Sequence, residues 1–236
     1  MPITLLEIQE RVRREANPKV ASQLQRFFKT GPGQYGEGDV FLGIRVPDLR
    51  RLTRAFGDVP MPVLPLLLAS PFHEERMLAL LLMIRGFESG DERARKRIYR
   101  FYLSNTRHIN NWDLVDASAP QIVGAYLHDR EKTPLYELAR SSMLWERRIS
   151  MVAAFHDIRR HHFDDALAIS ALLLADKEDL IHKAAGWMLR EIGKREVSVL
   201  ERFLIRHYRD MPRTMLRYAI EKFPEEKRMA YLKGKV

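Results

Sequence analysis

The sequence Asn110-Asn111-Trp112-Asp113-Leu114-Val115-Asp116 places a large aromatic residue and a carboxylate four positions apart. In an α-helix, residues i and i+4 share one face, with Cβ atoms about 5–6 Å apart. We therefore predict a helix in which Trp112 and Asp116 project together, while Leu114 and Val115 turn toward the core. Such a helix has one side for packing and one side for chemistry.

Two further tryptophan-bearing segments follow at similar intervals. They are Trp145-Glu146-Arg147-Arg148 and Lys183–Arg190, which contains Trp187. Positions 112, 148 and 187 are roughly 36 and 39 residues apart, in the range of helical-pair repeats. Because stacked repeats align equivalent positions along one surface, the spacing predicts that the three segments converge on one site.

Composition bounds the class of protein. The 236 residues are 46% hydrophobic, which argues against disorder, and the 40 Lys+Arg against 31 Asp+Glu give a net charge of +9. This charge favours an anionic partner such as nucleic acid, although a solvated basic surface would give the same balance. The absence of cysteine excludes disulfides, thiolate chemistry and cysteine-ligated metal centres.

No targeting or membrane signal is evident in the sequence. The segment Met1–Glu7 lacks a basic region followed by an apolar run and a cleavage site. No apolar run approaches the roughly 18 residues of a membrane span. We therefore expect a cytoplasmic protein.

Apolar residues recur at helical intervals throughout, and no segment alternates long enough to make a sheet. Thr4 and Glu7 have capping-box spacing, and Asn17-Pro18 fits a cap and a first helical position. The sequence predicts an all-α array of short antiparallel helices in a single domain, residues 1–236. The predicted helices are Leu5–Glu15, Pro18–Phe28, Asp48–Phe56, Met61–Ala69, His73–Phe87, Asp91–Leu103, Trp112–Leu127, Pro134–Ser142, Leu144–Arg160, Phe163–Leu174, Lys177–Gly193, Val197–Tyr208, Pro212–Phe223 and Glu225–Lys233.

One segment is rich in glycine and lies in the interval Thr30–Val40. It has neither the GxGxxG nor the GxxxxGK[ST] spacing of a nucleotide-binding loop, and no strand is predicted before it. We interpret it as a plain surface loop.

A row of cations marks a later helix. Lys183, Trp187, Arg190 and Lys194 fall at helical spacing, so that an indole lies among basic side chains. This row suits a phosphate backbone, whereas a solvated outer face is the alternative interpretation.

Asp116 also has two interpretations. A carboxylate beside a tryptophan is costly to bury unless it is paired, and Arg148, one repeat further on, is a possible partner in an ion pair. Trp145 is expected in the core, as most tryptophans are. The adjacent His161 and His162 point to different faces and lack a third ligand, so no metal site is expected.

The chain resembles the bacterial AlkD-like DNA glycosylases, and the resemblance extends over nearly its whole length. The family has HEAT-like helical repeats in a right-handed α-solenoid with a concave basic DNA-binding surface, and its members remove N-alkylated purines. The resemblance implies that Trp112, Trp187 and Asp116 surround the damaged nucleotide and that Arg148 contacts DNA. It is carried by Asn17-Pro18, Arg26-Phe27, Phe41–Ile44, Pro47, Arg50, Trp112-Asp113, Val115-Asp116, Trp145, Arg148, Lys183-Ala184, Gly186-Trp187 and Leu189–Glu191.

The sequence departs from the family at the N-terminal end of the implied DNA-binding surface. Phe27 stands where a tyrosine is known, and Arg45 stands at a glutamine position. A phenylalanine donates no hydroxyl hydrogen bond, and an arginine adds charge near the duplex. We therefore expect Phe27 and Arg45 to contact the strand opposite the lesion differently.

The implied chemistry needs one carboxylate and no cofactor. A 3- or 7-alkylated purine is already cationic, so it leaves without being protonated, and Asp116 would stabilise the oxocarbenium-like sugar and orient water. The indoles offer π faces to the cation, and Arg148 and Lys183 would hold phosphates. The resemblance further implies no base flipping. The expected partner is duplex DNA bound by a monomer, and the alternative function is a non-catalytic helical-repeat module that binds DNA structure or a protein.

Overall fold

The structure is a computed structural model that describes residues 3–236, so Met1 and Pro2, the start of the predicted domain and of the segment Met1–Glu7, lie outside it. Helices account for all regular structure in these residues, apart from one isolated bridge between Val40 and Phe72. The predicted all-α class is confirmed. No helix among residues 3–236 has the length and apolarity needed to cross a membrane.

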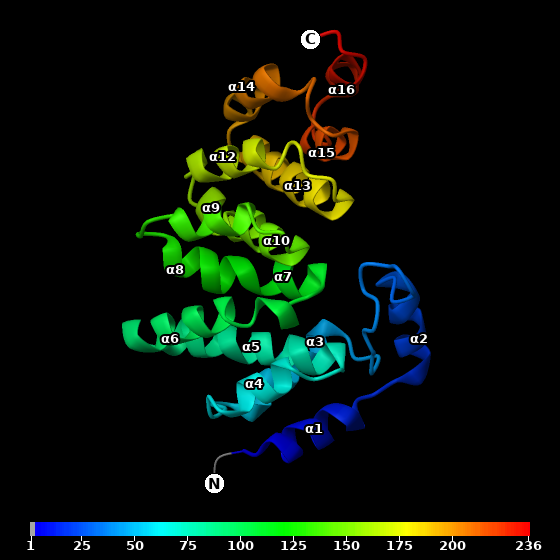
Figure 1. Ribbon diagram of the computed structural model, residues 1–236, viewed down its shortest axis with the longest axis vertical. Coiled ribbons are helices and arrows are strands. Elements are labelled where there is room, and N and C mark those ends of the chain that lie inside the picture. The colour runs from blue at the N-terminus through cyan, green and yellow to red at the C-terminus, as the bar shows by residue number, and fades with distance from the viewer. Residues whose placement is uncertain (1–2) are drawn as a thin grey trace. The chain divides into compact units, whose positions relative to one another are not determined.

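The chain divides into two compact units, Met1–Ser118 and Ala119–Val236 (Figure 1). The helices of the first unit follow the predicted intervals to within a few residues. They are α1 (Leu5–Arg14), α2 (Pro18–Phe27), α3 (Val46–Phe56), α4 (Val63–Leu68), α5 (His73–Ser89), α6 (Glu92–Leu103), a 3-10 turn (Thr106–His108) and α7 (Trp112–Ala119), whose last residue belongs to the second unit.

Caps define the start of the first two helices. The Thr4 side chain accepts the Glu7 backbone N–H at 3.3 Å, and the Glu7 carboxylate accepts the Thr4 backbone N–H at 2.8 Å. Asn17 caps α2 by accepting the N–H groups of Lys19 and Val20. Each cap supplies an acceptor for backbone donors that the helix itself leaves unpaired, as predicted.

Helix α5 is the centre of the first unit, with α3, α4 and α6 packed around it. Its interior residues from Met77 to Ile84 are buried. Its first turn is also buried although it is charged, because each side chain is paired. The Glu74 carboxylate, for example, accepts backbone N–H groups from Leu42, Gly43 and Ile44 at 2.8–3.1 Å. These contacts attach the segment after the glycine-rich loop to α5.

The second unit packs around α13 (Asp179–Arg195), which contacts α10, α12, α14 and α15. In Figure 1 its helices lie in successive pairs, such as α9 beside α10. This pairing agrees with the predicted array of helical repeats. The unit contains a π-helix (Pro120–Gly124), α8 (Ala125–Leu127), α9 (Thr133–Ala139), α10 (Leu144–Ala153), α11 (Phe155–Ile158), α12 (Asp164–Leu172), α13, α14 (Val197–His207), α15 (Arg213–Ala219) and α16 (Glu225–Leu232).

Two predicted helices are interrupted. The interval Trp112–Leu127 passes through the π-helix that begins at Pro120, since proline has no N–H for the α-helical ladder. The interval Leu144–Arg160 divides at Ala154 into α10 and α11. Hydrophobic periodicity alone does not reveal either interruption, because the apolar residues continue through both.

Candidate functional site

Helix α7 divides its faces as the sequence predicts. Leu114 and Val115 are fully buried, whereas Trp112 and Asp116 are partly exposed. The expectation that an indole and a carboxylate project from the same helix face, one turn apart, is confirmed. This pair forms the centre of the candidate site.

Trp112 is held in place by aromatic contacts and one hydrogen bond. Its ring stacks on Phe28, with centroids 5.1 Å apart, and meets the edge of Phe27 at 5.9 Å. Its indole Nε1–H donates to the hydroxyl of Tyr35 at 3.3 Å. The indole is therefore positioned before any ligand arrives, which lowers the entropic cost of using it in binding.

The glycine-rich segment supplies Tyr35 and so takes part in this site. It is a loop, as predicted, but not a plain surface loop, because Gly36 and Asp39 are buried. A Cβ on Gly36 would lie 2.5 Å from the carbonyl oxygen of Phe28, so only glycine allows the loop to approach α2 this closely. The loop braces Trp112.

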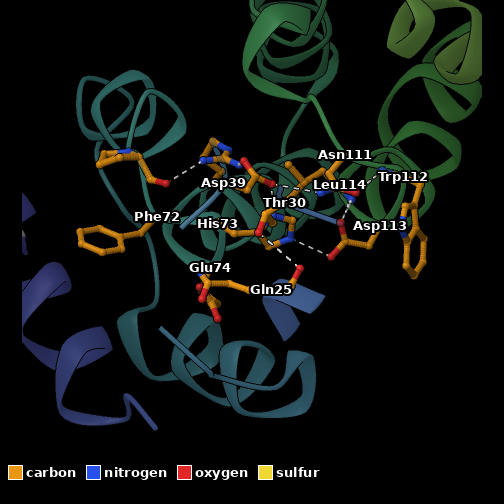
Figure 2. Close-up of polar contacts among 12 residues, drawn as sticks. Gln25, Thr30, Asp39, Phe72, His73, Glu74, Asn111, Trp112, Asp113 and Leu114 are labelled. Atoms are coloured by element: carbon orange, nitrogen blue, oxygen red, sulfur yellow. Dashed lines mark hydrogen bonds and ion pairs between the residues drawn. The ribbon is translucent and has the colours of Figure 1, made fainter. Parts of the chain in front are cut away.

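Behind Trp112, a buried histidine lies between two carboxylates, as Figure 2 shows. His73 at the start of α5 contacts Asp39 Oδ2 through Nδ1 at 3.0 Å and Asp113 Oδ2 through Nε2 at 2.8 Å. Asp39 also accepts hydrogen bonds from Arg76 and, at 3.0 Å, from Asn111. The network joins the loop, α5 and the start of α7.

The charge of this network follows from its geometry. Burial opposes protonation of His73, but the hydrogen bonds and negative charges of Asp113 and Asp39 outweigh it and raise the His73 pKa to about 9. Burial likewise opposes ionisation of Asp39, yet hydrogen bonding to His73 and the charge of Arg76 hold the Asp39 pKa below its ordinary value. At neutral pH His73 is therefore an imidazolium that donates to both carboxylates.

Asp113 and Asp116 consequently have different environments on one helix. Asp113 accepts from His73 and from the backbone N–H of Leu114 at 2.9 Å, so its carboxylate serves the network. Asp116 is close enough to the buried Tyr102 to influence its ionisation. Burial raises the Tyr102 pKa, the hydrogen bond with Ser118 lowers it, and the negative charge of Asp116 raises it further.

A cavity of about 380 Å³ opens beside the aromatic cluster in the first unit. Phe27, 62% exposed, and the exposed Arg45 both line it, and Asp113 and His73 contribute polar atoms. Within residues 3–236 the Arg45 side chain has no hydrogen bond or ion pair. The structure thus brings Phe27, Arg45 and the Trp112 cluster into one region. The other lining residues are Val20, Gln23, Leu24, Phe28, Phe41, Ile44, Val46, Leu49, Glu74 and Met77.

The predicted basic row lies on α13 of the second unit and is largely paired with acidic neighbours. Lys183 Nζ is 2.7 Å from Asp179, Lys194 Nζ is 2.6 Å from Glu191, and Arg190 pairs with Glu221. Trp187, partly exposed on the same helix, has its ring centre 5.6 Å from that of Phe155. Each of these basic side chains would have to leave its acidic partner before it could bind a phosphate.

Arg148 and Trp145 lie on α10. Trp145 is buried, as expected. Arg148 is only 5% exposed, and its guanidinium donates to the carbonyl oxygen of Leu180 at 2.6 Å. Arg148 therefore joins α10 to the start of α13.

Sequence reasoning missed Tyr35, Asp39 and His73. The available signal was the charged run His73-Glu74-Glu75-Arg76 directly before an apolar helix. Buried charges require partners, so such a run indicates a network. The identity of the partners depends on tertiary contacts.

The substitution Tyr35→Phe tests whether the Tyr35 hydroxyl holds the indole of Trp112 in place. It should cost about 0.5–1.5 kcal/mol of stability, because the indole N–H loses its acceptor. Urea denaturation measures the loss, and tryptophan emission reports the environment of Trp112. Tyr218→Phe in the second unit is the matched control. Equal stability and unchanged emission for Tyr35→Phe would contradict the bracing role.

Comparisons with known proteins identify a family and a shared fold. The family model described as DNA alkylation repair enzyme matches residues 8–223. No curated protein matches the chain in sequence. A solved structure described as a predicted DNA alkylation repair enzyme from Enterococcus faecalis has a TM-score of 0.68 and 17% identity, and covers 89% of this chain and 98% of that one. AlkD2 from Streptococcus mutans has a TM-score of 0.55 and 16% identity, covering 94% and 100%.

The structural likeness shows a shared fold, and the family match extends over residues from both units. The resemblance predicted from the sequence is confirmed, and the chain belongs to the family of DNA alkylation repair enzymes.

Proposed function

We propose that this protein is a DNA glycosylase that hydrolyses the N-glycosidic bond of cationic alkylpurines, N3-methyladenine and N7-methylguanine, in duplex DNA. The observation that carries the proposal is the pair on α7. Asp116 and the braced Trp112 are partly exposed on one face, one helical turn apart. Membership of an alkylation repair family supports the class of substrate.

The residues fit the chemistry of a substrate that already carries positive charge. The leaving base needs no general acid, because departure of a cationic purine gives a neutral product. Asp116 stabilises the developing oxocarbenium-like charge on the sugar and orients the attacking water. The π face of Trp112 contributes roughly 0.5–2 kcal/mol toward holding a cationic nucleotide, depending on desolvation.

Contacts with the rest of the duplex come from both units. In the first unit, Phe27 and Arg45 bind the strand opposite the lesion. In the second unit, Trp187 contacts the lesion nucleotide, and Arg148, Lys183, Arg190 and Lys194 hold the backbone. We propose that the protein acts as a cytoplasmic monomer and does not flip the base.

Release of free base from a duplex that contains one N7-methylguanine tests the proposal. We expect the wild type to release the methylated base and to leave an alkali-labile abasic site, with no reaction on the same duplex carrying guanine. Retained binding without base release would favour a non-catalytic DNA-binding module. If the protein did not bind the duplex at all, the proposal that DNA is its substrate would be wrong.

Binding to undamaged duplex should weaken with salt. The logarithm of the affinity should fall linearly with the logarithm of salt concentration, with a slope of about −0.9 for each phosphate neutralised. Arg45→Gln should reduce the magnitude of this slope by about 0.9, the value for one phosphate, because the Arg45 side chain forms no ion pair within residues 3–236 and its charge is free to meet the backbone. Fluorescence anisotropy at several salt concentrations measures both slopes. A wild-type affinity that does not change with salt would contradict DNA binding.

A further inference from the structure

A second cluster of ionisable groups lies in the second unit, on residues that the proposed glycosylase mechanism does not use. One ligand atom each of His128, His156 and Asp157 lies within 4.8 Å of the others. His156 and Asp157 are each 8% exposed, and the His128 side chain is 26% exposed. Two imidazoles and a carboxylate that converge below the surface are the donor set of many transition-metal sites.

The local backbone is built to bring these groups together. His128 follows α8, and His156 and Asp157 belong to α11. The π-helix Pro120–Gly124 lies directly before α8 and packs against α11. A Cβ on Gly124 would lie 2.2 Å from the carbonyl oxygen of Ala153 and 2.7 Å from the Cβ of His156, so glycine is required for this approach. π-Helical turns occur frequently at functional sites, where they change the direction of the following side chains.

Both carboxylate oxygens of Asp157 are engaged in the cluster, one by Lys132 and the other by the imidazole of His128, and a bound metal ion would take the place of the proton shared with the imidazole. Lys132 Nζ binds Asp157 Oδ2 at 2.8 Å and also donates to the carbonyl oxygens of Leu127 and His128. Asp157 Oδ1 lies 2.5 Å from His128 Nδ1. Lys132 therefore fixes one carboxylate oxygen as an outer-shell partner would, while the other oxygen points to the imidazole.

We propose that His128, His156 and Asp157 form a binding site for one transition-metal dication of the Zn²⁺ class, with water in the fourth position. Ligand atoms in a tetrahedral zinc site are about 3.4 Å apart, which follows from metal–ligand bonds of about 2.0–2.2 Å. The three ligand atoms lie within 4.8 Å of one another, so the side chains would have to adjust to reach this spacing when the ion binds. The two nitrogen donors favour Zn²⁺, Co²⁺ or Ni²⁺ over Mg²⁺ and Ca²⁺, which prefer oxygen.

The bound ion would connect the end of α8 to α11 and so fix the junction that follows the π-helix. This role is structural and independent of Asp116. Because a metal that binds the folded state more tightly than the unfolded state stabilises it, Zn²⁺ should raise the melting temperature of the protein.

The test is a titration of the full-length protein with Zn²⁺ after treatment with a chelator, in competition with a chromophoric zinc indicator. We expect one Zn²⁺ per chain with micromolar or tighter affinity. His128→Gln should weaken binding by more than about 100-fold, beyond the roughly 10- to 100-fold loss that follows removal of an outer-shell partner. His161→Gln is the control, because His161 is exposed and its ring packs near Phe163.

The wild-type measurement keeps the proposal falsifiable even if a variant folds poorly. Imidazole NMR signals of the wild type should show His128 and His156 shifting together as one equivalent of Zn²⁺ is added. No saturable binding below millimolar Zn²⁺ would overturn the site. Equal affinity for wild type and a folded His128→Gln would overturn it as well.

Discussion

Asp116→Asn should reduce the rate of base release about 10²–10³-fold, because the asparagine is neutral and cannot stabilise positive charge developing on the sugar. Affinity for duplex DNA should stay equal or rise slightly, since a negative charge facing phosphates is removed. The substitution conserves shape, and Asp116 lies on the partly exposed face of α7. A single-turnover assay on a duplex with N7-methylguanine measures the rate, and anisotropy measures the affinity.

Asp58→Asn is the matched control for this change of charge. Asp58 also lies in the first unit, but its side chain is 96% exposed and its contact with Arg85 is 4.0 Å long. We expect this variant to release base at the wild-type rate. If Asp116→Asn instead lost DNA affinity together with stability, Asp116 would be a structural ion-pair residue, and the catalytic role would be wrong.

His73→Gln should remove the pH-dependent part of the stability that comes from the buried imidazolium. The folded-state pKa of His73, about 9, lies above its ordinary value of 6.5. A group whose pKa is raised by folding stabilises the fold fully when the pH is below its pKa in the unfolded chain. This contribution is lost as the pH rises through its pKa in the folded protein. The protonated imidazole therefore contributes about 3 kcal/mol to the stability at pH 6, and most of this contribution is lost by pH 9.

Urea denaturation at pH 6 and pH 9 measures this effect in the wild type and the variant. The difference in unfolding free energy between the wild type and His73→Gln should shrink by about 3 kcal/mol from pH 6 to pH 9. Only the wild type loses a proton from the network as the pH rises. His161→Gln changes an exposed histidine and should show no such narrowing. A gap that is constant with pH would mean that His73 is neutral in the folded protein.

Helical periodicity predicted most of the fold because many of the helices are amphipathic, and capping residues marked the start of α1 and α2. Helix α7 is the clearest example, since the buried Leu114 and Val115 and the partly exposed Trp112 and Asp116 alternate as a helix requires. The π-helix escaped prediction because Pro120 lies within a continuous apolar pattern. Its position becomes evident only when the backbone hydrogen bonds are known.

The supports of the candidate site could not be predicted, because they join residues that are distant in sequence. Tyr35 reaches Trp112 from the glycine-rich loop, and His73 connects Asp39 to Asp113. The sequence around each of these residues does not indicate which distant residue its side chain contacts. The sequence predicts which residues face the substrate, whereas the structure shows which residues hold Trp112 and Asp113 in place.

The measurement that tests the central claim most directly is base release by the wild type from two duplexes that differ at one position. One duplex carries N7-methylguanine, a cation, and the other carries hypoxanthine, a neutral purine. We predict release of N7-methylguanine alone, since a site with one carboxylate and no general acid expels only a base that is already charged. Salt-sensitive binding of both duplexes without release of either base would contradict the glycosylase account.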